Sequence, residues 1–134
     1  MKKLRPEQVE GWITEKANRA FSRHLQNDQG RYAAANPVAT ARMASSWRIG
    51  SPGPDASFEP PRDSPGAVEI KKYSGKIEMD GTWHISNNVP YAVPVAKDPK
   101  YAKGGDGGAA WFDSISNASR GRLEEELRTE FRGQ

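Results

Sequence analysis

The residues of this 134-residue chain that are best able to do chemistry are two histidines and an acidic triplet, and neither set has the spacing of an active site. His24 and His84 lie far apart, without the HxH or HExxH spacing of a metal site. The triplet at 124–126 is consecutive, so on a helix its carboxylates point about 100° apart and do not converge on one bond.

Two further patterns resemble nucleophile or phosphate sites only superficially. Ser45 and Ser46 are not part of a GxSxG nucleophile elbow. The GGDGG run at 104–108 precedes an expected helix, where free amides attract anions, but it lacks the GK[ST] ending and Asp106 repels phosphate. We therefore expect no enzyme activity, no metal and no cofactor. His24 is interpreted as a boundary residue beside the apolar stripe of a helix, and His84 as a residue on the polar face of a strand.

The composition predicts one domain, 1–134, with a small core. Hydrophobic residues make up 35% and charged residues 28%, with 13 glycines and 10 prolines. The absence of cysteine excludes disulfides and thiolate catalysis. A net charge of +3 is too small for a dedicated nucleic-acid binder. No stretch approaches the length of a membrane span, so we expect no membrane association.

Apolar periodicity predicts a helix at each end of the chain. The first follows Pro6 and runs over residues 6–27, with the Asn-Asp-Gln-Gly run at 27–30 as its stop and an alanine-rich loop after it. The last covers residues 109–132, and its apolar stripe wraps around the helix, so that its two ends are expected to pack against different neighbours.

Between the helices, short alternating segments predict strands. Residues 46–49 read as a half-buried strand and residues 82–86 as the clearest strand, preceded by an Asp80-Gly81 turn. Trp47 and Trp83 are expected in the core. Residues 67–76 predict a short helix, 76–79 either extend it or form a strand, and 91–95 form an edge or bend because of two prolines.

The predicted fold class is α+β: a small, mostly antiparallel sheet flanked by an N-terminal and a C-terminal helix, with long Pro/Gly-rich loops. An extended loop is expected at 50–65, where five prolines exclude regular structure, and a flexible loop at 97–108.

Two stretches stand apart from this general pattern. The first is P-V-x-T-x-R-x-x-x-S-W at residues 37–47, and the second is N-N-x-P-Y-A at residues 87–92. With an amphipathic first helix, a proline-rich loop and a final helix, this combination resembles the neck or tail-completion proteins of long-tailed bacteriophages, which are head-to-tail connectors. The resemblance covers most of the chain and rests on the combination of these features.

The chain departs from the family pattern within both stretches. The family often reads P-V-D-T-G, and here Ala39 and Ala41 stand at the aspartate and glycine positions. Without a capping carboxylate and a turn-forming glycine, we expect this loop to be helical. The family's Y-A is often followed by an acidic residue and a glycine, whereas residues 93–96 read V-P-V-A. The exit from the turn is therefore expected to differ.

The resemblance implies a structural virion protein that assembles into a homo-oligomeric ring, expected to be a hexamer, in the phage neck. This ring would join the portal-side head-completion proteins to the tail tube, with DNA passing through its lumen. The chain would be found in the virion, and in the host cytoplasm during assembly.

A closed ring of identical subunits requires a heterologous interface. The candidate patches are the loop at 50–65, the edge around Tyr91 and the outer stripe of the last helix. For Tyr91 and Tyr101 a core position and an interface position are equally supported. The interface candidates are Pro52, Pro54, Phe58, Pro60, Pro61, Asn87, Asn88, Pro90, Tyr91, Tyr101 and Phe131.

Two alternative functions fit the same sequence. One is a tail terminator protein that caps the tail tube. The other is a small basic nucleic-acid-binding protein, whose phosphate contacts would come from Arg42, Arg48, Lys71 and Lys72.

Overall fold

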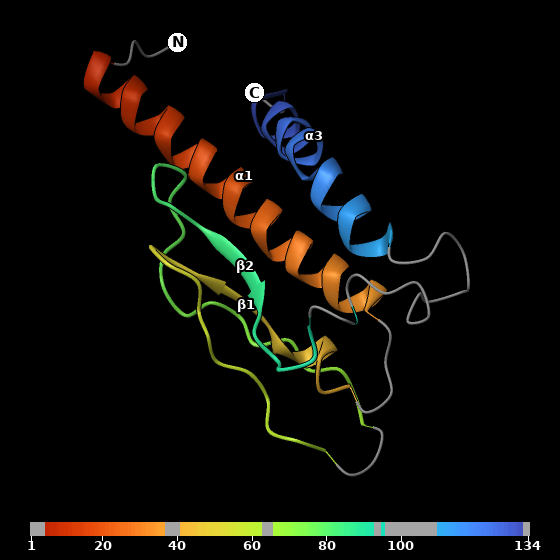
Figure 1. The fold of residues 1–134 in the computed structure, drawn as a ribbon. Helices are drawn as coiled ribbons and strands as arrows, with labels where there is room; N and C mark the ends of the chain where they lie inside the picture. The colour runs from red at the N-terminus through yellow and green to blue at the C-terminus, as the bar shows by residue number, and fades with distance from the viewer. Residues whose placement is uncertain (1–4, 37–40, 63–65, 93–94, 96–109, 133–134) are drawn as a thin grey trace.

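The computed structural model describes residues 5–36, 41–62, 66–92, 95 and 110–132. Its elements are α1 (Pro6–Ala35), the 3-10 helix η1 (Ala44–Ser46), β1 (Trp47–Gly50), β2 (His84–Asn87) and α3 (Ala110–Arg132) (Figure 1). β1 and β2 pair antiparallel, with Trp47 opposite Asn87 and Gly50 opposite His84. The predicted α+β class, with a helix at each end of the chain flanking a small antiparallel sheet, is confirmed.

The two long helices run antiparallel along one another. The Lys16 ammonium lies 3.7 Å from Glu130 near one end of the pair, and the Tyr32 hydroxyl lies 2.7 Å from that of Ser116 near the other. The sheet lies beside α1, and the N-terminal end of α1 extends past it (Figure 1). Residues 6–15 of α1 are consequently exposed.

The predicted end of the first helix near Asn27 is wrong, because α1 continues to Ala35. The polar residues that suggested a stop are buried and satisfied by tertiary contacts. Asp28 is bound by α3, and the Gln29 amide donates to the Trp47 carbonyl at 2.8 Å and to the Lys71 carbonyl at 3.0 Å. These bonds outweigh a weak local preference for ending the helix.

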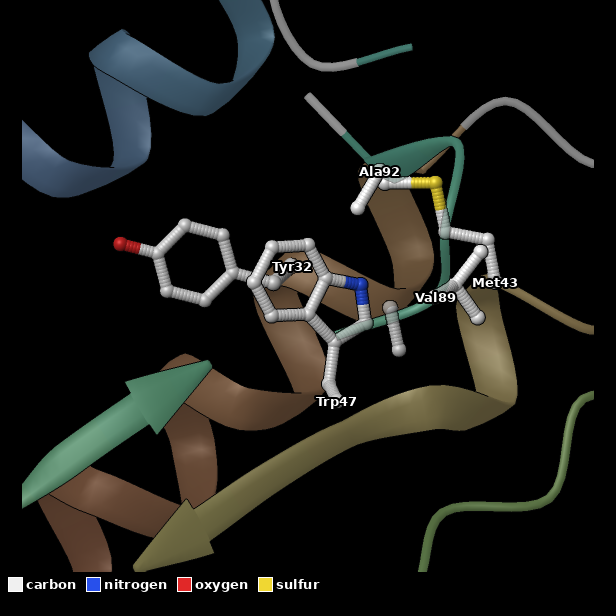
Figure 2. Packing of buried hydrophobic residues seen from close by; sticks show 6 residues of the cluster. Tyr32, Met43, Trp47, Val89 and Ala92 are labelled. Atoms are coloured by element: carbon white, nitrogen blue, oxygen red, sulfur yellow. The ribbon is translucent and has the colours of Figure 1, made fainter. Parts of the chain in front are cut away.

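Trp47 occupies the centre of the main core cluster, as predicted. Its ring stacks on Tyr32 at 4.6 Å between centroids, and Trp111 and Phe112 of α3 complete the aromatic group. Figure 2 shows the Tyr32 and Trp47 rings side by side, with Met43, Val89 and Ala92 packed on the other side of the indole. The indole N–H donates to the buried Asn36 side chain at 2.9 Å, so the polar atom of Trp47 has a hydrogen-bond partner inside the core.

β1 is buried at all four positions, which corrects the predicted half-buried strand at 46–49. Residues 51–62, which we call the strap, have neither helix nor strand structure and turn back over β1. The strap's Glu59 N–H donates to the Ser46 hydroxyl at 2.9 Å, and its carboxylate accepts from Arg48 at 2.9 Å. The reversal is tight: a Cβ on Gly50 would lie 2.4 Å from the backbone nitrogen of Asp55.

The expected short helix at 67–76 and the expected strand at 76–79 are both absent from the described residues. Residues 66–73 instead have neither helix nor strand structure and are held by hydrogen bonds to neighbouring elements. One of these bonds runs from the Glu69 N–H to the Ser45 hydroxyl, at 2.9 Å. Ile77 is buried against Leu25 and Ile49. The turn that includes Asp80 and Gly81 is confirmed by a backbone hydrogen bond from Gly81 to Glu78 of 3.1 Å.

The second strand begins two residues later than predicted, at His84. Trp83, expected in the core, is only partly buried. Its ring packs edge-on against Tyr73, and its indole N–H donates to the Glu78 carbonyl at 2.6 Å. Trp83 therefore closes the smaller cluster around Leu25, Ile49 and Ile77 from the outside.

We predict that Trp47→Ala lowers the free energy of unfolding by about 3–5 kcal/mol, because it leaves a large cavity and removes the hydrogen bond from the indole to the buried Asn36 side chain. Trp83→Ala serves as the matched control and should cost clearly less, since its ring is partly exposed. Urea denaturation followed by circular dichroism measures both. An equal or larger loss for Trp83→Ala would mean that the main core does not centre on Trp47.

Candidate assembly surface

The described parts of the two sequence stretches that carry the family resemblance, 41–47 and 87–92, are joined by hydrogen bonds. The Asn87 side-chain amide donates to the Met43 carbonyl at 2.7 Å, and its oxygen accepts from the Val89 N–H at 3.3 Å. The Asn88 amide donates to the Asp55 carbonyl of the strap at 3.2 Å. Asn87 thus holds the turn after β2 against the segment that precedes β1, and Asn88 holds it against the strap.

Ala41 adopts the backbone conformation that a glycine favours. Its φ is 68°, in the left-handed region, and its carbonyl accepts from the Ser45 N–H at 3.0 Å. The expectation that this loop becomes helical without its glycine is therefore wrong at Ala41. Residues 37–40, which include Ala39, lie outside the described part of the chain.

Arg42 organises an exposed surface where the two stretches meet the strap. Its guanidinium carbon lies 5.5 Å from the ring centroid of Phe58 and 5.6 Å from that of Tyr91. Its Nε donates to the Glu59 carbonyl at 2.9 Å, which fixes the side chain between the rings. Phe58 remains 40% exposed and Tyr91 38% exposed. We call this group, Arg42, Phe58 and Tyr91, the arginine–aromatic surface.

The structure brings some of the predicted interface residues together and separates others. Phe58 and Tyr91 meet at Arg42, and several of the other candidates are also exposed: Pro52, Pro54, Pro60, Pro61, Asn88 and Pro90. Asn87 is partly buried and engaged within the chain. Phe131 packs edge-on against Trp12 of α1 at 6.1 Å rather than facing outward. Tyr101 and the predicted loop at 97–108 lie outside the described residues.

The four basic residues of the nucleic-acid alternative are in different environments. Arg48 is only 3% exposed, and its guanidinium donates to the Ser45 carbonyl, the Ser57 hydroxyl and the Glu59 carboxylate. This side chain cannot reach a phosphate. Arg42 is held between two rings, whereas Lys71 and Lys72 are exposed.

A buried cluster of polar side chains joins α1 to α3, and it contains a serine, a histidine and an aspartate, the residue types of a catalytic triad. Asp28, 1% exposed, accepts hydrogen bonds from Arg31 at 2.9 Å, from Arg122 at 2.9 Å and from the Ser119 hydroxyl at 2.5 Å. His24, 5% exposed, places its Nε2 3.1 Å from the Ser119 oxygen. His24 therefore lies deeper than the boundary position predicted for it.

The arrangement of Ser119, His24 and Asp28 does not activate a nucleophile. In a catalytic triad the carboxylate and the hydroxyl bind opposite nitrogens of the imidazole. Here both face Nε2, which also lies 3.4 Å from Asp28, and Nδ1 is buried without a partner. The Ser119 proton goes directly to the carboxylate, so we assign the Nε2–H tautomer to His24. The cluster is a structural tie between two helices.

Burial and charge act on the two titratable groups of this cluster. Burial lowers the pKa of His24 below its ordinary value of 6.5, partly opposed by the negative charge of Asp28. Burial alone would raise the pKa of Asp28, but hydrogen bonds from Arg122 and Ser119 outweigh it and bring the pKa below its ordinary 3.8. The folded protein therefore favours neutral His24 beside ionised Asp28.

Sequence patterns missed the residues that make these ties. Asp28, Gln29 and Asn36 look like loop-forming residues, and each is almost fully buried. Asp28 and Asn36 each lie four positions from the buried Tyr32, so residues 28, 32 and 36 fall on one side of a helix. That spacing was the available sequence signal for their burial.

The described residues contain no group of three or more histidine or acidic side chains placed to hold a metal ion. None of the helices that they form is long and apolar enough to cross a membrane.

Comparisons of the chain with protein-family models, with curated proteins and with solved structures gave no match.

We predict that the free energy of unfolding falls as the pH is lowered below about 6.5, because the unfolded chain protonates His24 while the folded chain resists it. A second decline begins below about 3.8, where the unfolded chain starts to protonate Asp28, and it continues until the pH has passed through the lower pKa of the folded state. Urea denaturation at a series of pH values measures both. His24→Gln should remove the first decline and His84→Gln should leave it; the reverse pattern would contradict the assignment.

Proposed function

We propose that this chain is a structural subunit that assembles into a ring in the neck of a long-tailed bacteriophage, between the head-completion proteins and the tail tube. The arginine–aromatic surface is the observation that carries the proposal. It gathers Arg42 and Tyr91, from the two stretches that resemble the neck family, with Phe58 of the strap. Residues of the resemblance thus meet at one exposed place.

The chemistry of this surface suits protein contact. Tyrosine and arginine are enriched at the centres of protein interfaces, where they combine apolar area with a polar end. The guanidinium is held by the Glu59 carbonyl and the strap is anchored on Ser46, so the surface is fixed before a partner arrives. Exposed prolines next to it, Pro60, Pro61 and Pro90, also have restricted backbones. Little conformational entropy is lost on binding such a surface.

Ala41 supports the resemblance at a position where the sequence departs from it. The family pattern has a glycine there, and Ala41 keeps the left-handed φ of 68° that a glycine favours. A non-glycine residue adopts this conformation at a cost of about 1–2 kcal/mol, which supports a requirement for the turn at this position.

The nucleic-acid alternative is less well supported by the geometry. Arg48 is buried against Glu59, and Arg42 is committed to two aromatic rings. This leaves Lys71 and Lys72 from the original set, fewer phosphate contacts than a tight binder uses.

We predict that Phe58→Ala/Tyr91→Ala leaves the melting temperature nearly unchanged but weakens self-assembly by about tenfold or more, as expected for interface anchors. Native mass spectrometry measures the subunit number, and negative-stain microscopy shows whether a closed ring forms. Ile13→Ala, which shortens an exposed apolar side chain on α1, is the matched control and should assemble normally.

A wild-type chain that stays monomeric at high concentration would contradict the ring. Rings of unchanged stability in the double variant would remove the arginine–aromatic surface from the interface. A ring that binds isolated tail tubes and stops their growth would identify a tail terminator instead.

A further inference from the structure

An open groove of about 1100 Å³ runs along the exposed first half of α1. Its second wall is the turn segment 75–80, joined to the helix by a hydrogen bond of 2.8 Å from the Met79 N–H to the Asn18 side chain. Ile77, itself buried in the smaller core cluster, lines the groove. Both walls are thus fixed by contacts within the subunit.

The groove has an excess of unpaired negative charge. Its basic side chains are all engaged: Arg19 lies 3.1 Å from Glu15, Lys76 lies 3.3 Å from Glu78, and Arg23 is bound by Glu126 and Glu130 of α3. Three further lining carboxylates, Glu7, Glu10 and Asp80, form no ion pair with any part of the chain that the structure describes. A partner for this groove should therefore be basic.

Residues 66–73 have the complementary character. Lys71 and Lys72 are exposed and form no ion pair within the described residues, while Val68 and Ile70 are 40% and 41% exposed. The backbone is held without helix or strand structure by the bond from Glu69 to Ser45 and by the bond from Gln29 to the Lys71 carbonyl. With two lysines against one acidic residue, Glu69, this fixed segment presents a net basic edge with apolar side chains.

The two lysines lie far from Glu7 and Glu10, although residues 66–73 lead directly into the wall of the groove at 75–80. The Gln29 side chain holds Lys71 near the C-terminal end of α1, while Glu7 and Glu10 lie in its first turns. The helix between Glu10 and Gln29 is about 28 Å long at the rise of an α-helix. The lysines therefore cannot reach Glu7 and Glu10 of their own subunit, whereas the lysines of a second copy can.

We propose that subunits contact each other head to tail, with residues 66–73 of one copy lying in the α1 groove of the next. This inference rests on the ring proposed above and adds a second contact between neighbouring subunits, in addition to the one made by the arginine–aromatic surface. Lys71 and Lys72 would pair with Glu7, Glu10 and Asp80. Because the two patches differ, the contact is heterologous, which is the kind that generates closed rings.

Charge reversal tests this contact. Glu7→Lys/Glu10→Lys and Lys71→Glu/Lys72→Glu should each raise the dissociation constant for self-assembly by at least about tenfold at low salt, since each variant opposes like charges. Sedimentation velocity and native mass spectrometry measure the assembly. Glu124→Lys/Glu125→Lys, on the exposed side of α3, makes the same charge change as the groove variant and should assemble like the wild type.

Mixing the two charge-reversed variants gives the most specific result. Each groove then finds an oppositely charged segment only on the other variant, so the mixture should assemble while each component alone does not. Mass spectrometry with one variant isotopically labelled should show equal numbers of the two. The quadruple variant should also assemble alone, because both patches are reversed together.

The outcomes separate this contact from the ring itself. If the wild type and both charge-reversed double variants form rings equally well, the proposed contact is wrong but the proposed ring is retained. A wild type that remains monomeric overturns both. Loss of duplex DNA binding in Lys71→Glu/Lys72→Glu, without recovery of assembly on mixing, would assign the lysines to nucleic acid instead.

Discussion

The structure depends on the burial of one carboxylate, that of Asp28. A charge removed this completely from water is tolerated only where opposite charges and donors surround it, and Arg31, Arg122 and Ser119 supply them. Because two of these partners belong to α3, the interaction fixes how far α3 slides along α1. That position in turn brings the aromatic residues at the start of α3 onto Trp47. A polar contact therefore sets the geometry of the apolar core.

The same carboxylate marks the limit of what the sequence could predict. Periodic apolar residues correctly indicated both terminal helices, both strands within two residues, and the α+β class. The Asn-Asp-Gln-Gly run was misinterpreted because local propensity favours a helix end there, and only partners distant in sequence reverse that preference. The strap similarly changes the environment of β1. Alternation predicted that one face of this strand is exposed to solvent, but Glu59 and Ser57 of the strap cover Arg48. The residues that make these contacts are polar, so a search for periodic apolar residues does not find them.

The candidate surface was predicted in its members but not in its arrangement. Phe58 was an interface candidate as part of the loop at 50–65, and Tyr91 was a candidate for either the core or an interface. Nothing in the sequence indicated that one arginine lies against both rings. Arg42 was assigned instead to phosphate contacts. The correction follows from folding, because the strap turns back at Gly50 and carries Phe58 to the segment before β1.

Gln29 fixes the position of the segment that carries Lys71 along the axis of α1. One side-chain amide holds both the Trp47 and Lys71 carbonyls to the helix whose other end carries Glu7 and Glu10. An α-helix is stiff along its axis and has a fixed rise per residue. In the ring that we propose, the stretch of α1 between Glu10 and Gln29 would therefore set the distance between the contacts that one subunit makes with its two neighbours.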